Sequence, residues 1–183
     1  MNKKALVILA DGFEEIEAIT PIDILKRVGV EVIMAGLGGT SIKSTRGVTI
    51  SADMELDKVA FVPDVIIFPG GMPGAENLAN SPKVKDLIKS VDSEGKLIAA
   101  ICASPAYVLA PTGVLDGKKA TGYPGTEDKF PSSTKISSED VVRDGNVITS
   151  RGPGTAASFA FMIANELVGS EKARKVAEGM LFA

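Results

Sequence analysis

Four short, mostly apolar runs alternate with longer amphipathic stretches along this chain, and the alternation restricts the folds that it can adopt. The apolar runs cover residues 4–10, 30–37, 64–68 and 97–102, and the helical candidates cover residues 14–28, 83–91, 105–110 and 156–179. Runs of this length, the first three of them with β-branched residues, are typical of strands buried on both faces. The order of the segments predicts an α/β fold in which helices cover both faces of a central, mostly parallel sheet.

Two further segments, residues 40–52 and 135–149, are polar, β-branched and contain turns. We interpret both as antiparallel pairs at the edges of the sheet, and Asp144-Gly145 predicts a hairpin turn in the second. The chain has 183 residues, a length that buries one core well and is short for two. We therefore expect a single domain, 1–183.

The composition excludes two classes of partner. The formal net charge is −3, aromatic residues make up 5% of the chain, and there is no Trp. This leaves neither a basic surface for nucleic acid or anionic lipid nor aromatic platforms for unpaired bases. No apolar stretch approaches the roughly 20 residues of a membrane span, and the apolar run near the N-terminus leads into an acidic loop rather than a signal-peptide cleavage site. We expect a cytoplasmic protein without a nucleic-acid or membrane partner.

The chain contains one Cys and no His. It therefore forms no internal disulfide, no usual structural zinc site and no Cys-His or Ser-His-Asp catalytic unit. The segment 152–157 matches the pattern G-x-G-x-x-A, but no second strand of a dinucleotide-binding unit follows it. We expect chemistry without a metal or cofactor, performed by carboxylates, hydroxyls, Lys, Tyr or the single thiol.

The single thiol, Cys102, lies where an apolar strand must turn directly into a helix that Pro105 can begin. The end of a parallel strand is where open α/β sheets gather their chemistry. A helix N-terminus contributes about 2 kcal/mol at most, which lowers a pKa by at most about 1.5 units. An activated thiolate therefore needs a further hydrogen-bond donor. The alternative interpretation is a small buried hydrophobic residue without function.

Two other strand ends contribute candidates for the same crevice. Glu17 is in phase with Ile24 and Val28 on the apolar face of its helix, so burial favours its protonated form, which can donate a hydrogen bond to a thiolate. The alternatives are a solvated acidic first turn and a helix that restarts near Pro21. The glycines that follow residue 69 suit either an anion-binding backbone or a plain tight turn.

Ordered motifs across nearly the whole chain resemble the ThiJ/PfpI superfamily, most closely the branch of the Parkinson-disease-linked DJ-one protein and bacterial YajL-type proteins. The motifs are the apolar run 5–10 with Glu14-Glu15-Ile16-Glu17, then Pro69-Gly70-Gly71, Ala99-Ala100-Ile101-Cys102-Ala103, and Thr149 to Thr155. The resemblance implies a flavodoxin-like sandwich that is usually homodimeric.

The resemblance also implies roles for individual residues. Cys102 matches the oxidation-prone nucleophile and Glu17 its protonated partner. The remaining implied positions are backbone N–H donors at Gly71 and Ala103, an anion pocket near a dimer interface at Arg46 and Arg151, and further pocket residues at Gly70 and Tyr123. Tyr123 replaces a His found in several relatives, so the resemblance does not imply peptidase activity.

Two hypotheses for function follow from the resemblance. The first is a cofactor-independent enzyme of glyoxalase or deglycase type, in which Cys102 attacks a small reactive carbonyl and Glu17 carries the proton. The second is a redox sensor or chaperone in which peroxide converts Cys102 to sulfinic acid without turnover. The outward-facing pair Ile16 and Ile19 predicts a homodimer that covers them, and the alternative is two scattered exposed side chains.

Overall fold

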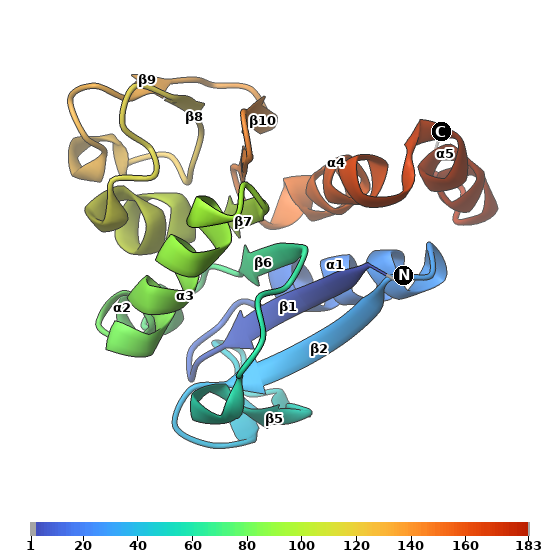
Figure 1. Cartoon of the computed structure of the whole chain (residues 1–183), viewed down its shortest axis with the longest axis horizontal. Coiled ribbons are helices and arrows are strands. Elements are labelled where there is room, and N and C mark those ends of the chain that lie inside the picture. The colour runs from blue at the N-terminus through green and yellow to red at the C-terminus, as the bar shows by residue number, and fades with distance from the viewer. Residues whose placement is uncertain (1–2, 183) are drawn as a thin grey trace.

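The computed structural model describes residues 3–182, and its centre is a seven-stranded sheet in the order β10-β11-β7-β6-β1-β2-β5 (Figure 1). These strands are β1 Lys4–Leu9, β2 Glu31–Gly36, β5 Met54–Glu55, β6 Val65–Phe68, β7 Leu97–Ile101, β10 Val141–Asp144 and β11 Val147–Ser150. All neighbouring strands run parallel except β10 and β11. The prediction of a mostly parallel sheet is confirmed.

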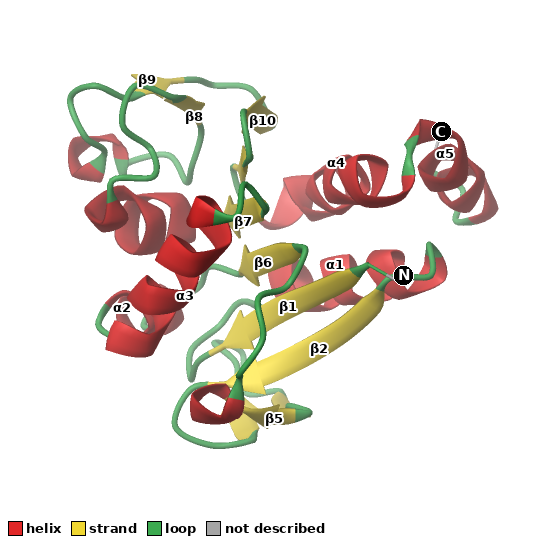
Figure 2. Cartoon of the chain, viewed as in Figure 1, coloured by secondary structure: helices red, strands yellow, loops and turns green. Residues whose placement is uncertain are grey.

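Helices cover both faces of this sheet (Figure 2). They are α1 Glu15–Arg27, α2 Gly74–Ala79, α3 Pro82–Ser93, α4 Ala156–Val168 and α5 Ser170–Gly179. α1 and α4 pack against each other on one face, and α3 packs on β6 and β7 from the other. Because both faces are covered, the central strands β6 and β7 are apolar throughout, and every residue of β6 is buried.

Two helical predictions need correction. The predicted helix over residues 156–179 is divided between α4 and α5, because Gly169 has φ 86° and ends α4 in a conformation that favours glycine. The short helix α2 was not predicted. The predicted helix at 105–110 is a single π-helical turn, Pro105–Leu109, and shorter 3-10 turns occur at Leu56–Lys58, Ala110–Thr112, Glu127–Lys129 and Pro153–Thr155.

The two predicted edge pairs have different outcomes. β10 and β11 form the expected antiparallel edge hairpin around the Asp144-Gly145 turn. The first pair, β3 Ser41–Lys43 and β4 Thr49–Ser51, is antiparallel but forms a sheet of its own, so its placement at the main edge is wrong. The loop after β1 binds it instead, through Gly12 N to Lys43 O at 2.7 Å and Thr45 N to Phe13 O at 2.8 Å.

A second small sheet accounts for the start of the second predicted segment. β8 Lys119–Ala120 and β9 Lys135–Ile136 pair in parallel and lie beside β10 (Figure 1), and β8 contacts β10 and β11. The edge of the main sheet next to β2 is taken by the two-residue strand β5.

α1 presents the acidic candidate to the interior. The helix continues through Pro21 without restarting, and Glu17, Ile24 and Val28 are all fully buried. The predicted phase of Glu17 is therefore confirmed. The same helix leaves Ile16 and Ile19 exposed at 52% and 44%, as the helical wheel predicts.

The sheet order brings three strand ends together. β6 lies between β1 and β7, so the loops that follow these three strands meet at one edge. β2 lies on one side of β1, and β6 lies on the other. The strand order therefore reverses at this edge, and open α/β sheets form their crevices at such a point. None of the helices formed by residues 3–182 is long and apolar enough to cross a membrane.

Candidate active site

Cys102 occupies a sharp turn at the end of β7. Its φ of 65° lies in the left-handed region, which costs a non-glycine residue about 1–3 kcal/mol and is sustained only by its surroundings. The Cys102 N–H donates to Ser150 O at 2.9 Å, and its carbonyl accepts from Tyr123 N at 2.8 Å. Ser104 ties the turn to the neighbouring loop by donating its hydroxyl to Pro69 O at 2.6 Å. The thiol is thereby fixed in place, with 9% of the residue exposed.

Glu17 lies behind this turn, with no exposed surface. Its Oε2 accepts from the Gly70 N–H at 2.8 Å. Its Oε1 is buried and has no hydrogen-bond partner within the described part of the chain. The thiol of Cys102 is close enough for each group to shift the pKa of the other. A buried carboxylate oxygen without a donor is costly, whereas a protonated oxygen here can donate toward the sulfur.

The carboxyl and the thiol compete for one proton. Burial raises the pKa of Glu17 to about 7, and the nearby charge of Glu14 adds to this rise. Burial and then the ionised Glu17 raise the pKa of Cys102 to about 12. Protonation of Glu17 removes its share of this rise, because the neutral carboxyl carries no charge, whereas the effect of burying the thiol remains.

Backbone N–H groups donate to both members of the pair. The N–H groups of Ala103 and Gly71 donate to the sulfur and act to lower the pKa of Cys102. The carboxyl of Glu17 receives one backbone N–H, from Gly70. These donors act to lower the pKa of each group, so they partly offset the effect of burial on both the sulfur and the carboxyl.

Gly70 permits this close arrangement. A Cβ at this position would lie 2.7 Å from Cys102 Cβ, 2.7 Å from Glu17 Oε2 and 3.0 Å from Ala103 N. Gly71 is equally confined, since its φ is 89° and a Cβ would approach Glu14 N to 2.5 Å. Both glycines therefore have a steric function beyond a plain turn.

The thiol opens into a pocket of about 460 Å³. Of the predicted residues, Gly71, Ala103, Arg46 and Tyr123 line it with Cys102, while Gly70 and Glu17 lie behind its wall. Sequence reasoning missed its other lining residues, which are Glu14, Thr45, Met72, Tyr107, Thr126 and Pro153. Glu14 and Pro153 lie within the motifs that carry the family resemblance, and Met72 and Tyr107 lie close after the Gly-Gly pair and Cys102, so these four had a signal in the sequence.

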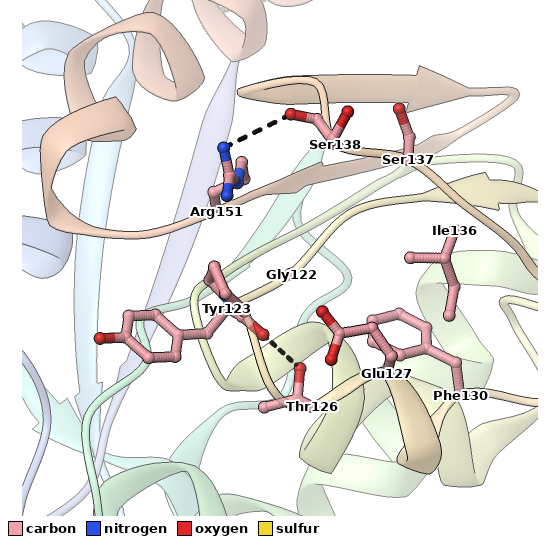
Figure 3. A pocket seen from close by; sticks show the side chains of 10 residues that line it. Gly122, Tyr123, Thr126, Glu127, Phe130, Ile136, Ser137, Ser138 and Arg151 are labelled. Carbon is pink, nitrogen blue, oxygen red and sulfur yellow. Dashed lines mark hydrogen bonds between the residues drawn. The ribbon is translucent and has the colours of Figure 1, made fainter.

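Arg151 does not line the cysteine pocket. It lines a neighbouring pocket of about 330 Å³, in which its guanidinium lies on the side opposite Glu127 (Figure 3). Its Nη1 donates to Ser138 O at 3.5 Å and lies 3.9 Å from an Asp140 oxygen. Tyr123 and Thr126 line both pockets. Within one chain, the structure therefore does not bring Arg46 and Arg151 together in one cavity.

Among residues 3–182, no three acidic, Cys or His side chains are close enough together to hold a metal ion. The groups that the strand ends bring together here are the thiol, the carboxyl of Glu17 and the backbone N–H groups around them.

Comparison with known proteins identifies close relatives. The chain matches the model of the DJ-1/PfpI family over residues 3–166. It is 48% identical over 186 residues to Protein dj-1beta of Drosophila melanogaster, a match covering 100% of this chain and 99% of the relative. The crystal structure of Drosophila melanogaster DJ-1beta has a TM-score of 0.96 to this chain, at 47% identity and with 100% of both chains covered.

Two further relatives bear on chemistry. The Glutathione-independent glyoxalase DJR-1.2 of Caenorhabditis elegans is 37% identical over 184 residues, covering 100% of this chain and 98% of the relative. The structure of oxidized Toxoplasma gondii DJ-1 has a TM-score of 0.95 at 40% identity, covering 99% of each chain. The structural matches confirm the predicted flavodoxin-like fold.

Replacing Gly70 tests the packing of the site. We expect Gly70→Ala to fold but to separate Cys102 from Glu17, because the added methyl meets backbone and Cβ atoms that cannot move independently. The rate of Cys102 alkylation by iodoacetamide at neutral pH should fall at least about ten-fold, and thermal denaturation should show a loss of about 1–3 kcal/mol. Gly179→Ala is the control, because its Cβ meets nothing within 4 Å. Equal alkylation rates in both variants would contradict the proposed contact.

The buried carboxyl of Glu17 should also make stability depend on pH. Because its pKa rises from 4.5 to about 7 on folding, the native state binds more protons, so its stabilising effect is complete below about pH 4.5 and is lost as the pH rises through about 7. The full effect is about 3 kcal/mol. We expect the free energy of unfolding of wild type to fall by about this amount relative to Glu17→Gln between these limits, measured by urea denaturation. Parallel pH profiles would show that burial does not perturb this carboxyl.

Proposed function

This chain belongs to the DJ-1/PfpI family, and from that premise and the geometry of its site we propose that it is a cysteine-dependent stress-protection enzyme that converts small reactive aldehydes by a glyoxalase reaction. Cys102 is the nucleophile and Glu17 carries the proton. The reaction needs no metal or cofactor. Methylglyoxal, an aldehyde with a ketone on the next carbon, represents the substrate class.

One observation carries the proposal. Glu17 is fully buried, has one oxygen without a hydrogen-bond partner in the described chain, and lies beside the only thiol. A structural carboxyl would have both oxygens satisfied or exposed. A carboxyl with a pKa near 7 is poised to give and take a proton at neutral pH, which is what a general acid–base residue requires.

The first step forms a covalent adduct. The Cys102 thiolate attacks the aldehyde carbon, a sulfur–carbon bond forms, and the oxygen takes the proton from Glu17 to give a hemithioacetal. In this proposal the Gly71 and Ala103 N–H groups, which donate to the sulfur in the resting site, also stabilise the developing oxyanion. Glu17 is left as a carboxylate beside the carbon that it next deprotonates.

The second step moves hydrogen between the two carbons. Glu17 removes the hydrogen of the former aldehyde carbon as a proton and delivers it to the neighbouring carbon, while the hydroxyl proton passes from one oxygen to the other. The first carbon is thereby oxidised to a thioester and the second reduced to an alcohol. Water then cleaves the thioester, releasing a 2-hydroxy acid and restoring the thiolate and the protonated Glu17. One proton leaves with the product.

Similarity to a protein named Glutathione-independent glyoxalase supports this choice. The pocket of about 460 Å³ accommodates a three-carbon substrate with room to spare.

Oxidation of the same thiol is the second candidate function. The backbone donors that favour a thiolate also favour a sulfinate, and a Toxoplasma gondii relative has been solved in an oxidized form. In this reaction the sulfur attacks a peroxide oxygen, the O–O bond breaks, and sulfenic acid and water result. A second peroxide gives the sulfinic acid. This reading makes the protein a sensor or chaperone without turnover.

We further propose that the protein acts in the cytoplasm as a homodimer. Its lone cysteine suits a reducing compartment. Ile16 and Ile19 are exposed on α1, and Val48 on the nearby hairpin is 52% exposed. These side chains suit an interface between two copies. Sedimentation at micromolar concentration tests the dimer, and a monomer contradicts it.

Turnover of methylglyoxal by the purified protein tests the main proposal. With Cys102 confirmed reduced, wild type should produce lactate without added glutathione. Cys102→Ser should abolish the activity, and Glu17→Gln should lower kcat about 10²–10⁴-fold because it removes the proton carrier. Absence of turnover by reduced wild type contradicts the enzyme.

Mass spectrometry after peroxide treatment then separates the two functions. A protein that gains two oxygen atoms on Cys102 but does not turn over aldehyde supports the sensor. Retention of an unmodified thiol in folded protein excludes it.

A further inference from the structure

The turn of the β3–β4 hairpin carries Arg46 at the edge of the cysteine pocket. Arg46 is exposed and lines the pocket with Cys102. Its guanidinium forms no ion pair within residues 3–182, so its charge is not neutralised by a neighbour there. A long exposed side chain of this kind is placed mainly by its backbone. The position of the turn at residues 44–48 therefore decides where this charge acts.

Glu15 binds this turn through three consecutive residues. Its Oε1 accepts from Ser44 Oγ at 2.5 Å and from the Arg46 N–H at 2.9 Å, and its Oε2 accepts from Thr45 Oγ1 at 3.2 Å. The Ser44 hydroxyl in turn accepts from Val48 N at 2.9 Å, which closes the turn. Both carboxylate oxygens are thus occupied by the hairpin, and neither is engaged by the Arg46 guanidinium.

The first turn of α1 therefore serves both sides of the pocket. Glu17 points inward to the thiol, and Glu15, two residues earlier, reaches outward to the hairpin. Burial acts against ionisation of Glu15, but the hydrogen bonds from Ser44, Arg46 and Thr45 outweigh it and hold its pKa below the ordinary value. Glu15 is therefore ionised at neutral pH, where it holds the turn at residues 44–48 through these hydrogen bonds.

From this geometry we propose that Glu15 is a positioning residue, which holds Arg46 over the Cys102 pocket and so sets the preference of the pocket for negatively charged reactants. The inference rests on the proposed function in one respect, since it requires Cys102 to be reactive. It extends that function by assigning charge selectivity to a residue that does not line the pocket.

Removing the Glu15 carboxylate has two opposite effects on the anion preference of the pocket, one through its charge and one through the position of Arg46. Removing the Glu15 carboxylate deletes a negative charge near the pocket, and by charge alone this favours an anionic reagent. Releasing the turn removes Arg46 from the pocket, which disfavours the same reagent. If Glu15 positions Arg46, Glu15→Ala should therefore lose anion preference even though its net charge is more positive than that of wild type.

The test compares alkylation of Cys102 by iodoacetate and by iodoacetamide. The two reagents differ in charge, but in both the Cys102 thiolate displaces iodide from a CH2 carbon. The ratio of the two rate constants reports anion preference and cancels changes in thiolate fraction. We expect this ratio to fall about three- to ten-fold in Arg46→Ala and similarly in Glu15→Ala, the range for a cation several ångströms away at intermediate dielectric. Glu15→Gln should remain near wild type, because the amide oxygen still accepts from Ser44 and Arg46.

Two controls keep the result specific. Asp23→Ala removes an equal charge from the same helix, where Asp23 pairs with Arg27, and should not lower the ratio. In the Arg46→Ala background, Glu15→Ala should have no further effect on the ratio if Glu15 acts through Arg46.

The outcomes separate this inference from the proposed function. A ratio that stays constant or rises in Glu15→Ala, while iodoacetamide still reacts at the wild-type rate, overturns the positioning role alone. An unchanged ratio in Arg46→Ala overturns the positioning role as well, and this measurement does not require the Glu15 variant to fold. Failure of wild type to react with either reagent overturns the proposed function instead.

Discussion

The site depends on burying the Glu17 carboxyl against the only thiol of the chain. Burial raises the pKa of this carboxyl to about 7, and its Oε1 has no hydrogen-bond partner among the described residues. Gly71 and Ala103 direct two backbone donors at the sulfur. The two groups therefore titrate as a coupled pair, and these backbone donors stabilise a negative charge on the sulfur. Nucleophilic attack, proton transfer and oxidation of the thiol all depend on this distribution.

The fold imposes this arrangement from several directions. The sheet order places the ends of β1, β6 and β7 side by side, and each strand end supplies a different component. α1 brings the carboxyl, the loop after β6 brings glycines without which the groups could not approach, and β7 ends in the strained turn of Cys102. Hydrogen bonds from neighbouring segments hold that turn on both sides. Separating any one component changes the position of the shared proton.

Local patterns were sufficient to predict most strands, the inward face of α1 and the Cys102 turn, since these follow from periodicity and from punctuation by Gly and Pro. Long-range contacts were not predictable. The hairpin β3–β4 leaves the main sheet because it bonds to the loop after β1, and Arg151 faces a different cavity from Arg46. The roles of Glu15 and Ser104 depend on partners some 30 residues away. The helix behind Cys102 is a single turn. Instead, the individual backbone N–H groups of Ala103 and Gly71 act to lower the pKa of the thiol.

The most direct test of the shared proton is the rate of Cys102 alkylation by iodoacetamide against pH, for wild type, Glu17→Gln and Glu17→Leu. The account predicts that the wild-type thiolate forms below about pH 7 and that Glu17→Leu shifts its formation toward or above the ordinary thiol value of about 8.5, because the proton donor to the sulfur is lost. Glu17→Gln should lie between them, since its amide can still donate. Faster alkylation of Glu17→Leu than of wild type at neutral pH would contradict the account, because it would show that Glu17 is a carboxylate that suppresses the thiolate.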